Sequence, residues 1–221
     1  MGKLIVIDGL DGSGKSTQTD LVAKALAEQG IKVRQISFPD YKEPSSALVK
    51  MYLSGVFSEN PDDVNAYAAG SFYAVDRYAS YKQFWEKDYQ DGALILATRY
   101  ATSNAIHQMG KLPRNQWEDY LHWIEDFEYS KLGLPAPDLV IFLDMNRAVA
   151  DRLLSERYAG DESKRDIHEK NMAYLQHCRE TAEFAGQYWG WKKVCCDDGN
   201  APRPVEEITG QILQLIDEAG L

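Results

Sequence analysis

Five short runs of apolar, mostly β-branched residues recur along the chain and are separated by longer helical patterns. The runs cover residues 4–7, 33–38, 93–97, 139–143 and 193–196. Strands that are apolar on consecutive residues are buried on both faces of a sheet, and helices are the usual crossovers between parallel strands. We therefore predict an α/β fold with a five-stranded parallel sheet covered by helices on both faces. Ligands of such sheets bind beyond the carboxyl ends of the strands, so the residues after each run are candidates for chemistry.

Amphipathic patterns fill the intervals between the apolar runs. Apolar residues with helical spacing mark residues 15–28, about 64–89 and 205–219. A further stripe has large apolar side chains at helical spacing, and we interpret it as core. Its members are Trp117, Tyr120, Leu121, Ile124 and Phe127. No repeat or low-complexity segment interrupts this order, so a single domain over residues 1–221 is predicted.

A complete phosphate-binding motif, G-x-x-x-x-G-K-[ST], lies between the first apolar run and the first helical pattern. It contains Gly9, Asp11, Gly12, Ser13, Gly14, Lys15, Ser16 and Thr17. A strand, a glycine-rich loop and a helix in this order let backbone N–H groups surround a polyphosphate, which a chance glycine-rich turn would not provide. We predict that Lys15 reaches the β- and γ-phosphates of a bound polyphosphate and that the Ser16 hydroxyl binds Mg²⁺.

Charge and cysteine content restrict the possible partners. The 221 residues carry a formal net charge of −10, which is unfavourable for a protein that binds nucleic acid. Asp8 ends the first apolar run too early for a signal peptide, so neither secretion nor a membrane partner is expected. The cysteines at 178, 195 and 196 have no metal-binding spacing, which favours a reduced, cytoplasmic protein.

Polar and aromatic residues at the predicted strand ends indicate a second pocket beside the loop. The candidates are Phe38, Tyr73, Arg77, Arg99, Ser103, Asn104, His107 and Gln108. On a helix that follows the third run, residues 100, 104, 107 and 108 share a face and could read the edge of a base. The alternatives are ordinary ones: aromatic residues in the core and a solvated helix face.

A polar, glycine-containing stretch with several cations, about 155–168, is predicted to act as a lid, although an ordinary solvated loop would have the same composition. An Asn-Lys pair, which G-proteins use to read guanine, is absent from the sequence. Motors and helicases are usually larger and more basic. These exclusions favour a small phosphoryl-transfer kinase with a P-loop NTPase fold.

Taken together in their order along the chain, these motifs resemble the thymidylate kinase family over essentially the full length. The matching pieces are the loop with Asp11, the Phe38-Pro39 pair, the spacing from the aromatic residues to Arg77, Arg99-Tyr100 with Ser103-Asn104, Pro137-Asp138, and a lid from Arg157 to Asp166. The resemblance implies an enzyme that transfers the γ-phosphate of ATP to dTMP with Mg²⁺, in dTTP biosynthesis. It also implies a homodimer formed through the long helix.

The resemblance also implies roles for individual residues. Asp11 would bind the sugar 3′-hydroxyl, and Arg99 would hold the acceptor phosphate. Arg77 and Tyr73 would flank the thymine with Phe38 behind it, while Ser103, Asn104 and Gln108 would lie along the base edge. Because the loop itself has no arginine, Arg157 or Arg165 would supply the catalytic cation from the lid.

Two positions depart from the family pattern. Thr98 replaces the usual Asp, so either Asp8 or Asp144 provides the anion near Mg²⁺ or turnover is slow. His107 replaces a Tyr that crowds the sugar or the base. Tyr73, where Phe is common, is a smaller change. Two alternatives therefore stay open: a kinase for another (deoxy)nucleoside monophosphate, and a nucleotide-binding regulatory protein without turnover.

Overall fold

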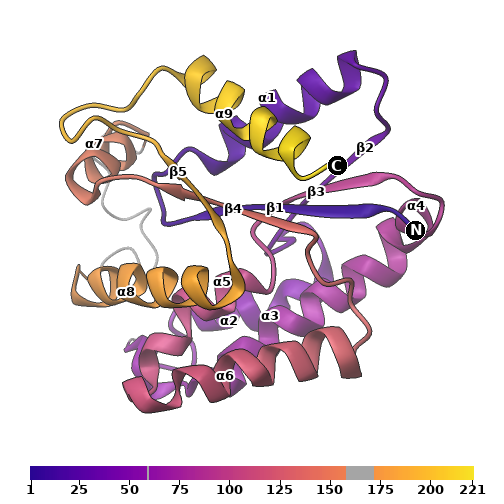
Figure 1. The fold of residues 1–221 in the computed structure, drawn as a ribbon. Coiled ribbons are helices and arrows are strands. Elements are labelled where there is room, and N and C mark those ends of the chain that lie inside the picture. The colour runs from indigo at the N-terminus through magenta and orange to yellow at the C-terminus, as the bar shows by residue number, and fades with distance from the viewer. Residues whose placement is uncertain (59, 158–171) are drawn as a thin grey trace.

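A five-stranded parallel sheet forms the centre of the fold in a computed structural model that describes residues 1–58, 60–157 and 172–221 (Figure 1). The strand order is β2-β3-β1-β4-β5, and each neighbouring pair is parallel. The strands are β1 (Lys3–Gly9), β2 (Val33–Ser37), β3 (Leu94–Thr98), β4 (Leu139–Asp144) and β5 (Lys192–Cys195). The predicted α/β fold is confirmed, and the strand limits differ from the predicted ones by one or two residues.

Two layers of helices cover the sheet. In β1, Leu4 and Val6 face one hydrophobic cluster and Ile5 and Ile7 face another, as the period of two requires for a strand that is buried on both sides. The second cluster joins α1 (Lys15–Glu28), α7 (Arg147–Arg157) and α9 (Val205–Glu218). The first joins α3 (Ala66–Ser80), α5 (Thr102–His107), α6 (Trp117–Ile124) and α8 (Met172–Trp189), which lie on the opposite side in Figure 1.

Short elements complete the described parts of the chain. Two further α-helices are α2 (Ala47–Leu53) and α4 (Glu86–Gln90). The 3₁₀ turns are η1 (Pro44–Ser46), η2 (Pro61–Asp63), η4 (Met109–Lys111) and η5 (Arg114–Gln116). Two π-helical segments, η3 (Tyr81–Trp85) and η6 (Glu125–Lys131), extend α3 and α6. No helix within the described ranges has both the length and the apolar character that a membrane span requires.

The long helical pattern at 64–89 is divided in the structure. Val64 has an extended backbone, and the Asn65 side chain caps α3 by accepting a hydrogen bond from Ala68 N at 2.9 Å, so the helix begins at Ala66. After Ser80 the chain passes through η3, whose wider turn places Trp85 in the core. The stripe at Trp117, Tyr120, Leu121 and Ile124 is buried as predicted, whereas the fifth member lies in η6 and is only partly buried.

Candidate active site

The glycine-rich loop connects β1 to α1 and has the backbone that a phosphate cradle needs. Gly12 and Gly14 have φ values of 82° and 83°, in the left-handed region where a side chain is unfavourable. Gly14 is the N-cap of α1, so the free N–H groups of the first helical turn face the loop. The Ser13 hydroxyl is buried and has no hydrogen-bond partner within the described residues. Ser16, in the first turn, is exposed.

Gly12 also brings the loop into close contact with α7. A Cβ atom at position 12 would lie 2.8 Å from the backbone oxygen of Ala150 and 3.1 Å from its Cβ atom. Both distances are too short for a side chain to enter without a backbone shift. Packing as well as backbone conformation therefore excludes an arginine from this position of the loop.

Lys15 lies folded over the loop. Its Nζ atom donates hydrogen bonds to Gly9 O at 2.9 Å and to Leu10 O at 2.7 Å, and it lies 3.8 Å from Asp11 Oδ1. The side chain is almost completely buried. These contacts hold the ammonium group at the rim of the phosphate cradle.

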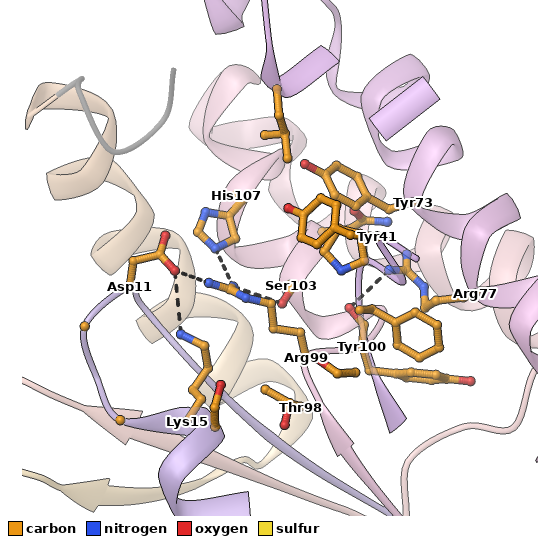
Figure 2. A pocket seen from close by; sticks show the side chains of 18 of the residues that line it. Asp11, Lys15, Tyr41, Tyr73, Arg77, Thr98, Arg99, Tyr100, Ser103 and His107 are labelled. Atoms are coloured by element: carbon orange, nitrogen blue, oxygen red, sulfur yellow. Dashed lines mark hydrogen bonds and ion pairs between the residues drawn. The ribbon is translucent and has the colours of Figure 1, made fainter. Parts of the chain in front are cut away.

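A cavity of about 440 Å³ opens beside the loop, and most of the residues predicted to form the site line it (Figure 2). From the loop it takes Asp11, Gly12, Gly14, Lys15, Ser16 and Thr17. From the rest of the chain it takes Phe38, Tyr73, Arg77, Arg99, Ser103, Asn104, His107 and Gln108. Tyr41 and Pro39 also line the cavity, and neither was among the predicted site residues. Gly9, Ser13 and Asp8 do not line it.

Arg99 stands at the junction between the loop and the cavity. It follows β3 with φ of 63° and is the one residue other than glycine with positive φ in the described parts of the chain. Such a conformation costs about 1 kcal/mol or more for a residue with a Cβ atom. Its guanidinium forms an ion pair with Asp11 and lies 3.8 Å from Asp8 Oδ1. Burial alone would lower the pKa of Arg99, but the two carboxylates raise it, so the side chain stays charged.

Asp8 is fully buried behind Arg99, and its carboxylate is already occupied. It accepts hydrogen bonds from Gly9 N at 2.8 Å, Thr102 Oγ1 at 2.7 Å and Ser103 Oγ at 2.8 Å. These three donors and the nearby guanidinium of Arg99 fix the orientation of the carboxylate. The arrangement gives Asp8 the role of a fixed anion that supports Arg99, and its role as a metal ligand stays a prediction.

Thr98, which replaces the family's usual Asp, and Asp144, the other candidate for the anion near Mg²⁺, both have partners close by. Thr98 Oγ1 donates a hydrogen bond to Thr19 Oγ1 at 2.9 Å. Asp144, at the end of β4, pairs with Lys193 at 2.6 Å and with Arg179 at 3.1 Å. Asp144 is therefore neutralised by two cations of its own, whereas the carboxylates of Asp8 and Asp11 both lie beside the guanidinium of Arg99.

His107 contacts Arg99 through one ring nitrogen and Cys178 through the other. Its Nε2 lies 3.0 Å from Arg99 Nη1, and an arginine can only donate, so Nε2 accepts. The proton of a neutral ring then resides on Nδ1, which lies 3.7 Å from Cys178 Sγ. Tyr174 donates to the backbone oxygen of His107 at 2.6 Å. The ring is held in one orientation beside Arg99, as Figure 2 shows.

Arg77 reaches the cavity from α3 and is paired with a residue that the sequence did not single out. Its Nε and Nη2 atoms donate to the two carboxylate oxygens of Glu128 at 2.7 and 2.6 Å. Both side chains are buried. In the sequence Glu128 follows the apolar stripe of α6, and a charged residue beside a buried stripe was the available signal.

The predicted lid cannot be placed. Arg165 and the side chain of Arg157 lie outside the described residues, and so does most of the segment 155–168. The assignment of a catalytic cation to one of these arginines remains a prediction.

A model of the thymidylate kinase family matches residues 7–203. The chain belongs to the thymidylate kinase family. It is 29% identical to a thymidylate kinase of Mycobacterium tuberculosis over 205 residues, which cover 88% of this chain and 92% of the relative. It is 28% identical to that of Schizosaccharomyces pombe, with 100% and 94% of the two chains covered. A solved thymidylate kinase of Candida albicans superposes with a TM-score of 0.69 at 21% identity, covering 98% of this chain and 92% of that one.

Proposed function

We propose that the chain transfers the γ-phosphate of ATP to dTMP, giving dTDP and ADP. Membership of the thymidylate kinase family supports this reaction. The observation that carries it is the position of Arg99, which lies between the phosphate loop and the acceptor end of the same cavity. A kinase for a nucleoside monophosphate needs this arrangement because two anionic substrates must be held end to end.

The donor end of the site is the loop. Its backbone N–H groups and the helix dipole of α1 bind the phosphates of ATP, and Lys15 contacts the β- and γ-phosphates. The buried Ser13 hydroxyl, which has no hydrogen-bond partner among the described residues, supplies one more polar group in the same loop.

The acceptor end is the cavity beyond Arg99. Asp11 binds the 3′-hydroxyl of the sugar, Arg99 binds the acceptor phosphate, and Tyr73 and Phe38 flank the base. The base edge meets Arg77, Ser103, Asn104 and Gln108. Gln108 supports this assignment because it is 1% exposed and its Oε1 has no hydrogen-bond partner within the described residues, although it lines the cavity. A buried acceptor without a donor is costly unless a ligand supplies one.

The chemical step is a displacement at phosphorus. An oxygen of the acceptor phosphate forms a bond to the γ-phosphorus as the bond to the bridging oxygen of ADP breaks. No strong base is needed because the acceptor oxygen is already anionic. Lys15 and Arg99 reduce the repulsion between the two anions and stabilise the charge of the transition state. Arg157 or Arg165 would add a further cation.

Mg²⁺ fits the donor set at the loop. Mg²⁺ usually binds through substrate phosphates, water and one or two protein groups rather than an all-protein cage. The exposed Ser16 hydroxyl is a suitable protein ligand, and the described residues contain no cluster of three or more His, Cys, Asp or Glu that could form a cage. When bound, the ion would neutralise charge on the phosphates. Asp8 would support the site from behind, through Arg99.

The chain also forms a single kinase domain in this proposal, with a lid near 155–168 that lies mostly outside the described residues. The free cysteines suit a reduced, cytoplasmic protein. A homodimer through α2 and α3 is supported by large apolar side chains that these adjoining helices leave exposed. They are Leu48, Met51, Val75 and Tyr78.

A second candidate is a kinase for another (deoxy)nucleoside monophosphate. The observation that favours it is His107, which lines the cavity where the family usually has a larger tyrosine. A regulatory protein without turnover receives less support because Lys15 and Arg99 both line the cavity that the phosphate loop and the acceptor end share.

The decisive experiment is a coupled ADP-release assay with ATP, Mg²⁺ and dTMP, dUMP, dCMP, dGMP, CMP and UMP. We expect the highest kcat/KM for dTMP. A higher value for another acceptor would favour the second candidate. No turnover with any acceptor, together with measurable ATP binding, would favour the regulatory protein.

A further inference from the structure

A buried carboxylate outside the cavity wall holds two side chains that line the acceptor end. Glu128 lies in the middle of η6, is 0% exposed and does not line the cavity. Its Oε2 accepts from Arg77 Nε at 2.7 Å. Its Oε1 accepts from Arg77 Nη2 at 2.6 Å and from Asn104 Nδ2 at 3.0 Å. One residue therefore fixes the position of two candidate base-reading groups.

Arg77 can only donate hydrogen bonds to a ligand. A guanidinium has five N–H donors and no acceptor, and Glu128 takes Nε and one N–H of Nη2. Nη1 lies 3.4 Å from Tyr100 O. Burial alone would lower the pKa of Arg77, but the charge and hydrogen bonds of Glu128 raise it, which keeps the group protonated. The N–H groups that remain can only donate.

Asn104, unlike Arg77, presents a hydrogen-bond acceptor to the cavity. Its Nδ2 lies 3.0 Å from Glu128 Oε1 and 3.2 Å from Gly70 O, and both of these oxygens are acceptors. The amide nitrogen must face them, which leaves Oδ1, on the other branch of the amide, for the cavity that Asn104 lines. A donor from Arg77 and an acceptor from Asn104 thus form one wall.

We propose that Glu128 is a positioning residue that sets the hydrogen-bonding polarity of the acceptor end and so selects 4-keto over 4-amino pyrimidines. The inference rests on the proposed function. A 4-keto pyrimidine presents the acceptor O4 beside the donor N3–H, which complements Arg77 and Asn104. A 4-amino pyrimidine presents the donor N4–H₂ beside the acceptor N3. A donor would then face the donors of Arg77, and an acceptor would face Asn104 Oδ1. Buried groups left unpaired in this way give large discrimination.

The variant Glu128→Gln tests this role because it keeps the size of the side chain but replaces one acceptor oxygen with a donor. The amide of Asn104 can then reverse. We expect the ratio of kcat/KM for dTMP to that for dCMP to fall at least about tenfold. Most of the change should be in the KM values of the acceptors, with the KM for ATP within about twofold of the wild-type value. Dissociation constants for dTMP and dCMP, measured by calorimetry, should shift in the same direction.

Glu125→Gln is the matched control. Glu125 lies in the same π-helical segment, and its carboxylate accepts a hydrogen bond from Trp189 Nε1 at 2.7 Å without lining the cavity. In the Glu125→Gln variant, the ratio of kcat/KM for dTMP to that for dCMP should equal the wild-type ratio. A residue with a merely structural role would lower the melting temperature and affect both acceptors alike.

A folded Glu128→Gln protein whose ratio stays within about twofold of the wild-type ratio would overturn the proposal. If this variant fails to fold, Glu128→Asp keeps the charge that pairs with Arg77 but is too short to reach both Arg77 and Asn104. The ratio should fall in this variant too, and an unchanged ratio would also overturn the proposal. The proposed function fails separately, if the wild-type protein does not phosphorylate dTMP.

Discussion

The carboxylate of Asp11 and the guanidinium of Arg99 form an ion pair at the point where the phosphate loop meets the acceptor cavity (Figure 2). Asp11 belongs to the loop and Arg99 follows β3, so the pair connects the two ends of the site. An acceptor phosphate that reaches Arg99 competes with Asp11 for the same guanidinium. The pair therefore places the cation where transfer requires it.

Arg99→Ala should lower kcat by about 10³-fold, because it removes the cation that stabilises the transferred charge. Coupled ADP release with saturating ATP and dTMP measures the effect. Arg34→Ala is the control, since Arg34 lies on the edge strand β2 and is 44% exposed. Activity of Arg99→Ala within a few fold of the wild type would contradict the assignment.

Lys15→Ala should likewise reduce kcat by roughly 10³-fold or more, because the loop would lose its contact with the β- and γ-phosphates. The melting temperature should change little, since the hydrogen bonds of Lys15 to Gly9 O and Leu10 O are made within the loop itself. Lys24→Ala, on the same helix and 74% exposed, serves as the control. A normal rate in Lys15→Ala would exclude the proposed role.

His107→Tyr should reduce the use of ribonucleotides. Tyrosine is larger than histidine and takes space from the cavity of about 440 Å³ near Arg99. We expect the ratio of kcat/KM for UMP to that for dUMP to fall by about fivefold or more, the size of effect that a steric contact gives. The same substitution at the exposed His122 should leave the ratio unchanged. An equal ratio in both variants would show that position 107 does not select the sugar.

Lys111 should make stability depend on pH. Its Nζ donates to Tyr52 Oη and Val64 O, both at 2.8 Å, and burial lowers its pKa from 10.5 to about 8. Between these values the folded protein binds fewer protons than the unfolded chain, so the free energy of unfolding rises with pH. Below the lower value the full cost of burying the charge is present.

Lys111→Met isolates this effect from the other groups that titrate at alkaline pH. The difference in unfolding free energy, wild type minus variant, should increase by about 2 to 3 kcal/mol from pH 8 to pH 10.5. Urea unfolding at several pH values gives the two curves. Parallel curves would mean that Lys111 titrates normally in the folded protein.

The sequence predicted the site best where backbone topology alone decides position. The carboxyl ends of parallel strands meet at one edge of the sheet, so a loop after β1 and an arginine after β3 had to lie together. Glu128 could not be found in this way. Its pairing with Arg77, 51 residues away, depends on how η6 packs against α3. Likewise, the hydrogen bonds that occupy Asp8 come from side chains of α5, whose orientation no spacing rule provides.

The prediction of secondary structure from the sequence was limited for a related reason. The apolar pattern at 64–89 continues through η3 because a π-helical turn keeps burying large side chains such as Trp85. Only a change of backbone hydrogen bonding marks the boundary, and periodicity does not record it. The start of α3 differs from the predicted one for another reason, since the Asn65 side chain caps the helix and it begins at Ala66.

The contact between Gly12 and Ala150 makes the phosphate loop and α7 mechanically interdependent. With no room for even a methyl group between the two backbones, α7 cannot advance toward the loop without pushing it. The loop in turn cannot widen on that side unless α7 retreats. A polyphosphate that stiffens the loop would thereby restrict the movement of α7 as well. Binding at the donor end therefore affects a helix that lies outside the loop.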